Sequence, residues 1–179
     1  MKRTESKKKQ DSAVPKKSLA APHQVLFGAL DGAKIKVGIV TARFNSDVTS
    51  RLEEGALRKL AELGVPAKNI RVASVPGAVE ITTAAMALLK SGVDAVITLG
   101  CVIRGETTHY EMVCTAVERG CTHLQLETGK PVVFGVLTTE NEDQAFDRVG
   151  GHHGHKGEEA AEVAVEMVNL LSAIKKSKK

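Results

Sequence analysis

Apolar runs alternate along the chain with segments in which apolar residues recur every three or four positions. Short apolar runs bounded by turn residues are typical of buried strands, and the longer repeat is typical of amphipathic helices. The runs predict strands at 35–40, 70–75, 94–100 and 132–137. The repeats predict helices at about 46–63, 78–90, 109–127 and 158–174, with a short helix that ends near 149.

The order of these segments predicts how they pack. Each predicted strand is followed by a helix, and the last strand is followed by two. Strands that are joined through helices run parallel, and right-handed crossovers place the helices on both faces of the sheet. We therefore expect a single α/β domain at 22–174, a three-layer sandwich in which a four-stranded parallel sheet lies between helices.

Three of the helices carry a capping signal at their start. The segments 108–111 and 139–142 both read Thr-x-x-Glu, the pattern of a capping box in which the two side chains bond free backbone N–H groups. Asn45 or Ser46 is expected to cap the helix after the first strand. These signals predict that three helices begin directly after strands.

Candidate site residues gather where the predicted strands end. In an open parallel sheet, ligands bind outside the carboxyl ends of the strands, and helix N-termini there offer N–H groups to anions. Phe44 follows the first strand, 77–80 the second, 105–109 the third and 138–141 the fourth. His109 stands in the first turn of its helix and can transfer protons near neutral pH. We expect one crevice to collect the first three segments.

Phe44 and Arg148 each allow two roles. Phe44 lies in a polar loop of a chain with 3% aromatic residues, so it is either a shelf for a flat ring or an apolar plug under its loop. Arg148 either complements the dipole of the short helix or binds a phosphate together with the amides around Thr107. The phosphate role requires two distant segments to meet, within one chain or between subunits.

The charge pattern separates basic tails from an acidic body. Residues 1–18 carry seven Lys/Arg and two acidic residues, and 175–179 add four lysines. Because the chain has a formal charge of +4 and these tails contribute +5 and +4, residues 19–174 carry −5. We expect a disordered basic N-terminal tail at 1–21 and a basic C-terminal tail at 175–179. Without interleaved aromatic residues, these tails do not favour nucleic acid binding.

Several chemistries lack support in the sequence. No apolar run is long enough for a signal peptide core or a membrane span, so we expect a cytoplasmic protein. Cys101, Cys114 and Cys121 are odd in number and lie in apolar segments, which predicts buried free thiols. The three histidines of 152–155 lack regular metal-site spacing, so we expect solvated loop side chains and no metal. Dinucleotide, Walker and serine-hydrolase motifs are absent from the sequence.

Five motifs stand in a fixed order over about 35–175. They are Arg43-Phe44-Asn45, Pro76-Gly77-Ala78-Val79-Glu80, the run from Gly100 to Glu111, the run from Phe134 to Asn141, and Arg148 followed by Gly154-His155-Lys156-Gly157. Together they resemble the 6,7-dimethyl-8-ribityllumazine synthase family, whose fold is flavodoxin-like. Five motifs in register are far more specific than any one of them.

The resemblance implies a transferase of riboflavin biosynthesis. Its members condense 5-amino-6-(D-ribitylamino)uracil with 3,4-dihydroxy-2-butanone 4-phosphate to give 6,7-dimethyl-8-ribityllumazine, phosphate and water. The family uses no cofactor and no metal. An imine forms, phosphate leaves, an enol tautomerises and a ring closes. Each of these steps moves protons and none needs a protein nucleophile, so positioning and one proton carrier can suffice.

The motif positions imply a role for each residue at the pyrimidine. By similarity, Phe44 stacks on the ring and His109 transfers protons. Main-chain groups hold the ring and the ribityl chain at Ala78, Val79, Glu80, Cys101, Val102 and Ile103.

The same resemblance implies the residues at the phosphate. Glu106 and Thr107 match the phosphate-binding positions, and we expect Glu106 to offer its backbone N–H and turn its carboxylate away. Arg148 matches the cation that pairs with the phosphate, a role for which lysine is a poor substitute, and Lys156 assists nearby. Phe134 matches a residue that the neighbouring subunit contributes, so the site is expected at a subunit interface.

The resemblance also implies small-molecule substrates and a homo-pentamer. In many members twelve pentamers close into an icosahedral 60-mer, and the short spacing from Arg148 to Lys156 favours that shell here. Riboflavin synthase is a candidate partner, and no membrane partner is expected. Two alternatives stay open: a catalytically silent flavin-binding or scaffolding shell of the same fold, and a different flavodoxin-like phosphate-binding enzyme.

Overall fold

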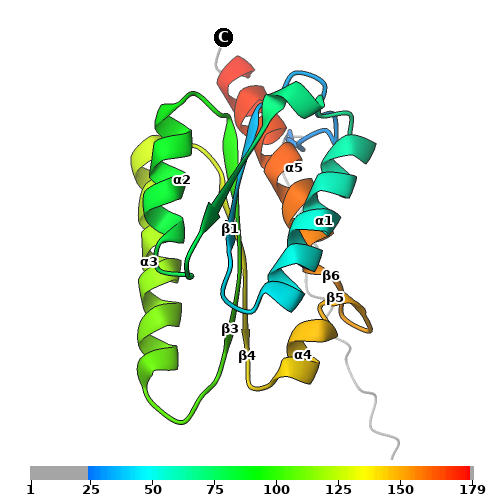
Figure 1. Ribbon diagram of the computed structural model, residues 1–179. Helices are drawn as coiled ribbons and strands as arrows, with labels where there is room; N and C mark the ends of the chain where they lie inside the picture. The colour runs from blue at the N-terminus through cyan, green and yellow to red at the C-terminus, as the bar shows by residue number, and fades with distance from the viewer. Residues whose placement is uncertain (1–23, 178–179) are drawn as a thin grey trace, which may run out of the picture.

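A four-stranded parallel sheet in the order β2-β1-β3-β4 forms the middle layer of the protein (Figure 1). The computed structural model describes residues 24–177, so the tail predicted at 1–21 and residues 178–179 lie outside the described residues. The strands are β1 (Val37–Ala42), β2 (Ile70–Val75), β3 (Ala95–Ile103) and β4 (Val132–Thr139). All four predicted strands are confirmed. Three extend further at their carboxyl ends than expected, because β1 stays paired up to Ala42, and β3 and β4 up to Ile103 and Thr139.

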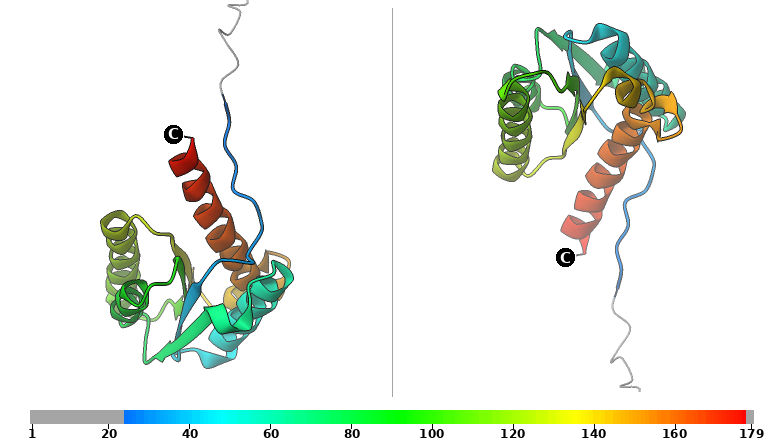
Figure 2. Two further views of the ribbon diagram at one scale, coloured as in Figure 1. Left: turned by 90° about the horizontal axis from the view of Figure 1, so that it is seen from above. Right: turned by 90° about the horizontal axis from the view of Figure 1, so that it is seen from below.

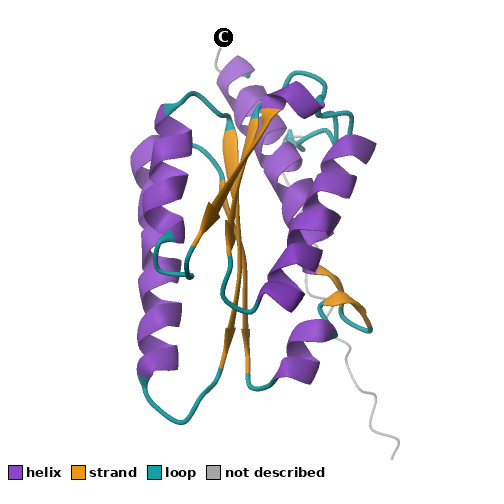
Figure 3. Ribbon diagram, in the orientation of Figure 1, coloured by secondary structure: helices purple, strands orange, loops and turns teal. Residues whose placement is uncertain are grey.

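Helices cover both faces of this sheet (Figures 1 and 3). On one face lie α2 (Ile81–Lys90) and α3 (His109–Thr128), and on the other α1 (Ser46–Glu62) and α5 (Lys156–Lys176). The views from above and below show the three layers edge-on (Figure 2). The smaller elements are a 3-10 turn (Ala67–Asn69), α4 (Glu142–Phe146), and a hairpin of β5 (Val149–Gly151) and β6 (Gly154–His155). The predicted α/β three-layer fold is confirmed.

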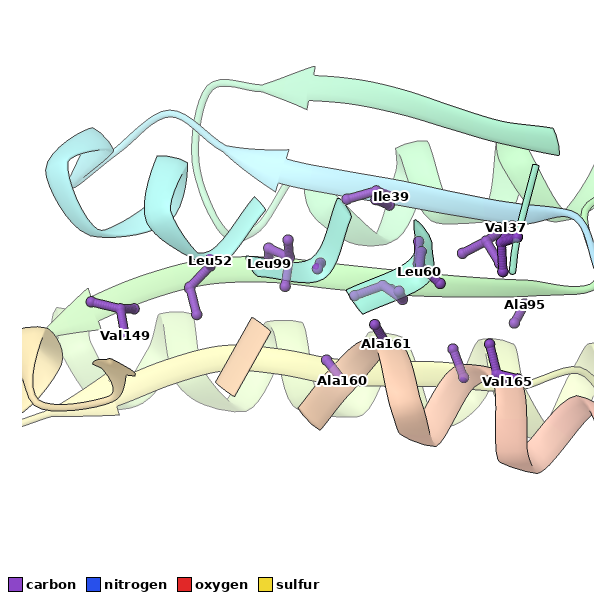
Figure 4. Packing of buried hydrophobic residues seen from close by; sticks show 14 of the residues in the cluster. Val37, Ile39, Leu52, Leu60, Ala95, Leu99, Val149, Ala160, Ala161 and Val165 are labelled. Atoms are coloured by element: carbon purple, nitrogen blue, oxygen red, sulfur yellow. The ribbon is translucent and has the colours of Figure 1, made fainter. Parts of the chain in front are cut away.

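The sheet divides the buried core into two clusters. Successive residues of a strand point to opposite faces, and Ile39 and Val40 of β1 accordingly enter different clusters. Figure 4 shows the first cluster, in which Leu52 of α1 and Ala161 of α5 pack against the sheet. Val117 of α3 belongs to the second. Because both faces are buried, the strands read in the sequence as continuous apolar runs.

The capping box predicted for α3 is wrong, although the helix starts at His109 as expected. Thr108 occupies the N-cap position, but its side chain makes no capping hydrogen bond. The carboxylate of Glu111 pairs instead with the guanidinium of Arg104. The local pattern therefore predicts the start of the helix correctly. The capping bond of Glu111 does not form, because its carboxylate pairs with a residue outside the helix.

The capping box predicted for α4 is also wrong. Thr139 is the last residue of β4, and the helix begins only at Glu142. Asn141 caps it, since its Oδ1 accepts a hydrogen bond of 2.9 Å from the backbone N–H of Gln144. This helix also ends earlier than the expected 149, at Phe146.

The helix predicted at 78–90 begins later, at Ile81, because the residues before it form a turn.

Helices α1 and α5 approach each other closely at two glycines. A Cβ on Gly157, in the first turn of α5, would lie 2.1 Å from the carbonyl oxygen of Leu52. A Cβ on Gly55, in the middle of α1, would lie 2.0 Å from Cε1 of the His155 ring. Only hydrogen atoms therefore fit at both positions, at Gly157 where α5 meets α1 and at Gly55 where α1 meets His155, the residue before α5.

We expect Gly157→Ala to lower the free energy of unfolding by about 1–3 kcal/mol, because the added methyl group meets a helix backbone that has to shift. Gly105→Ala is the matched control, since a Cβ there has no heavy atom within 4 Å. Its effect should stay within about 0.5 kcal/mol. Urea unfolding of both variants measures the difference, and equal losses would contradict the steric explanation.

Candidate functional site

A cavity of about 460 Å³ opens at the carboxyl ends of β1, β2 and β3, at the lower end of the sheet in Figure 1. The predicted crevice therefore exists and collects the three segments expected to form it. The predicted site residues that line it are Phe44, Ala78, Val79, Glu80, Cys101, Val102, Ile103, Thr107 and His109.

The loop after β1 presents Phe44 to this cavity. Its side chain is 71% exposed, so it does not plug the space under its loop. The backbone N–H of Phe44 donates to the carbonyl of Pro76 at 3.2 Å. Asn45 has a left-handed backbone with φ of 58°, and its Nδ2 donates to the carbonyl of Cys101 at 2.9 Å. Asn45 occupies the N-cap position of α1, as one of the two predicted residues, but its side chain bonds β3 and makes no capping hydrogen bond.

The turn between β2 and α2 forms a second wall. The backbone N–H of Gly77 donates to Oε2 of Glu80 at 3.0 Å, so the carboxylate is engaged with its own turn. Ala78 is buried and Val79 is half exposed at the cavity. The turn therefore contributes Gly77, Ala78, Val79 and Glu80 to the cavity lining, with the Glu80 carboxylate bonded to the turn itself.

The cysteines offer no reactive thiolate. Burial raises the pKa of Cys101 to about 11, and the negative charge of Glu142 adds to this effect. Burial also raises the pKa of Cys114 and of Cys121. All three are free thiols as predicted, and Cys101 and Cys121 are buried, whereas Cys114 is only partly buried. Near neutral pH these thiols stay protonated, so they are poor nucleophiles and poor metal ligands.

The segment between β3 and α3 carries the polar candidates. Glu106, Thr107 and His109 are all exposed. Thr107 Oγ1 accepts a hydrogen bond of 3.4 Å from the backbone N–H of His109. Thr107 and His109 line the cavity, whereas Glu106 does not. The arrangement places the imidazole of His109 and the N-terminus of α3 at the same cavity.

A second cavity of about 330 Å³ runs along β4 and the start of α5. It is lined by Phe134, Arg148 and Lys156 and shares no lining residue with the first. Arg148 Nη1 donates to the carbonyl of Gln144 at 2.7 Å, while Lys156 Nζ pairs with Glu159 at 2.7 Å. The predicted site is therefore split over two cavities of one chain.

The hairpin between α4 and α5 holds the three clustered histidines. His153 and His152 are exposed, and both bond Asp147, the first through Nδ1 and the second through its backbone N–H. These contacts lower the pKa of Asp147, with the His153 side chain as the larger cause. His155 is partly buried against Gly55, which corrects the prediction of a solvated ring. Over residues 24–177, no three side chains converge as metal ligands.

The sequence analysis missed several residues of the first cavity, among them Ala42, Tyr110 and Val113. The signal for two of them was present in the helical repeat. Tyr110 directly follows His109, and Val113 lies one turn further along the same face of α3. None of the helices in the described part of the chain is both long and apolar enough to span a bilayer.

Comparison with known proteins identifies the family of this chain. Residues 34–172 match the family model described as 6,7-dimethyl-8-ribityllumazine synthase. A protein of that name from Bdellovibrio bacteriovorus is 55% identical over 141 residues, which cover 79% of this chain and 78% of the relative. Another from Cytophaga hutchinsonii is 52% identical over 132 residues, which cover 73% and 83%. The chain belongs to the 6,7-dimethyl-8-ribityllumazine synthase family.

Proposed function

We propose that this protein is a 6,7-dimethyl-8-ribityllumazine synthase of riboflavin biosynthesis. It condenses 5-amino-6-(D-ribitylamino)uracil with 3,4-dihydroxy-2-butanone 4-phosphate and releases the lumazine, phosphate and water. The observation that carries the proposal is the cavity at the strand ends. There the motif residues from three different strand ends meet around His109 and Phe44.

The chemistry suits the groups at this cavity. The exposed ring of Phe44 stacks on the pyrimidine, and the main chain at Ala78 and Val79 bonds its polar edge. His109 carries protons between the amines and the ketone as the imine forms and the ring closes. The protonated thiol of Cys101 takes no covalent part, and none is required.

The split site supports a proposal about assembly. Phe134, Arg148 and Lys156 line a cavity apart from His109, so one chain does not bring the phosphate cation to the proton carrier. We propose that the second cavity of one subunit completes the first cavity of its neighbour, in a pentamer that is built into an icosahedral shell. Such head-to-tail contacts close into rings when the rotation between subunits allows it.

Turnover tests the proposed activity directly. Purified protein mixed with both substrates should form the lumazine, followed by its absorbance, well above the uncatalysed rate. Omitting either substrate, or denaturing the protein first, should abolish the excess. No excess product, combined with tight binding of the lumazine or a flavin, would instead support the silent scaffolding shell.

A further inference from the structure

Arg104 lies at the meeting point of three segments around the first cavity without lining that cavity. It follows β3 directly, and its backbone N–H donates to the carbonyl of Thr139 at 2.9 Å. Its guanidinium pairs with Glu111 and, through Nε at 2.7 Å, with Glu140. The same group lies over the ring of Tyr110, with its central carbon 4.1 Å from the ring centroid.

These contacts join the parts of the molecule that carry the site. Glu111 and Tyr110 belong to the first turn of α3, immediately after His109. Glu140 follows β4 and precedes α4. A single side chain thus fastens the start of α3 to the carboxyl ends of both β3 and β4.

Arg104 bridges the loop 105–108, because it precedes this loop and pairs with Glu111 beyond it. Within the described structure, few other side-chain contacts hold this loop. Residues 105–108 are all exposed, and α3 has no side-chain cap at its N-terminus. The hydrogen bond that Thr107 Oγ1 accepts from His109 is long, at 3.4 Å. Without the guanidinium, the first turn of α3 would lose its ion pair and its stacking contact at once.

The charge of Arg104 is already compensated within its own chain. Two of its nitrogen atoms bond carboxylates, and one face of its plane covers Tyr110. Two carboxylates pair with this one guanidinium, so the cluster carries a net negative charge. It therefore differs from Arg148, whose side chain lines a cavity and has no carboxylate partner among the salt bridges of residues 24–177.

We propose that Arg104 is a positioning residue of this site, which fixes the first turn of α3 so that His109 and the amides of Glu106 and Thr107 face the reacting groups. The inference rests on the proposed function. It adds a residue that acts through others: Arg104 orients the proton carrier and the phosphate-binding amides, and it does not touch the substrates.

The test compares Arg104→Ala with Arg58→Ala in the full chain. Arg58 is a matched control, because it also pairs with a glutamate, Glu158, but lies on α1 outside both cavities. Arg104→Ala should lower kcat roughly tenfold to a hundredfold and raise KM for the butanone phosphate, since small misplacements of catalytic groups are costly. Pyrimidine affinity, measured by titration without the second substrate, should change less than about twofold, because Phe44 is untouched.

Partner variants separate positioning from general stability. Glu111→Gln should lower kcat in the same direction, and the double variant with Arg104→Ala should lose no more than Arg104→Ala alone. Arg104→Lys should recover only part of the loss, because lysine lacks the planar fork. If Arg104→Ala does not fold, Glu111→Gln and Glu140→Gln carry the test.

The outcomes are distinguishable. Kinetics of Arg104→Ala equal to those of Arg58→Ala would overturn the inference while leaving the proposed function intact. The inference would also be overturned if the losses in kcat of Arg104→Ala and Glu111→Gln added up in the double variant. The same holds if Arg104→Ala weakened pyrimidine binding as strongly as it lowered kcat. A wild type without turnover would reject the proposed function and the positioning role together.

Discussion

Replacing His109 by alanine is expected to lower kcat about a hundredfold or more, because a positioned proton carrier typically contributes that much. Pyrimidine binding should be largely kept, since Phe44 and the turn before α2, to which we assign those contacts, line the cavity from other elements. Steady-state turnover gives kcat, and fluorescence titration with the pyrimidine gives Kd. The expected signature is a loss in kcat at nearly constant Kd.

His123→Ala is the matched control for this experiment. His123 lies on the same helix, about three-quarters of the way along α3. Its side chain is 76% exposed and lines neither cavity. Its replacement should leave kcat unchanged. A similar loss in both variants, or a His109→Ala enzyme with normal kcat and weak binding, would remove the proton-transfer role.

Arg148→Ala is expected to raise KM for the butanone phosphate about tenfold to a hundredfold, because a charge-assisted hydrogen bond is worth about 1.5–3 kcal/mol. Arg148→Lys keeps the charge but loses the bidentate fork, so its KM should lie between those of the wild type and the alanine variant. Arg148 also bonds the end of α4 through Gln144, an exposed contact with a small effect on stability. Thermal unfolding of both variants checks this point.

Mixing the two inactive variants tests whether the site is shared between subunits. When His109→Ala and Arg148→Ala chains assemble together in equal amounts, about a quarter of the shared sites contain both intact residues. Turnover should then exceed the mean of the two separate variants. Activity no higher than that mean, in assemblies shown to be mixed, would place the complete site within one chain.

The sequence predicts the strands well, because each is an apolar run bounded by turn residues. It does not predict where β3 and β4 end, since their last residues are fixed by pairing with each other, up to Ile103 and Thr139. The same pairing removes Thr139 from the capping box that its sequence suggests. Glu111 likewise finds Arg104, which lies outside the helix. Local patterns fail where a group has a partner from a different element.

The first cavity is predictable for a different reason. Ligands bind at the carboxyl ends of parallel strands, so the strand order alone predicts that Phe44 and His109 lie at the same site. Arg148 and Phe134 do not follow from this rule, because their cavity lies along β4 and α5. The family motifs supplied their roles, while the fold of a single chain keeps them apart from His109.

Gly55 has an evolutionary consequence. A glycine inside a helix costs about 1 kcal/mol relative to alanine, so mutation and selection should tend to replace it wherever space allows. Here the imidazole of His155 occupies that space, at the junction of α1 and α5. Homologous chains should therefore acquire a side chain at position 55 only where position 155 has become smaller. Positions 55 and 155, which are far apart in the chain, should therefore covary among homologous sequences.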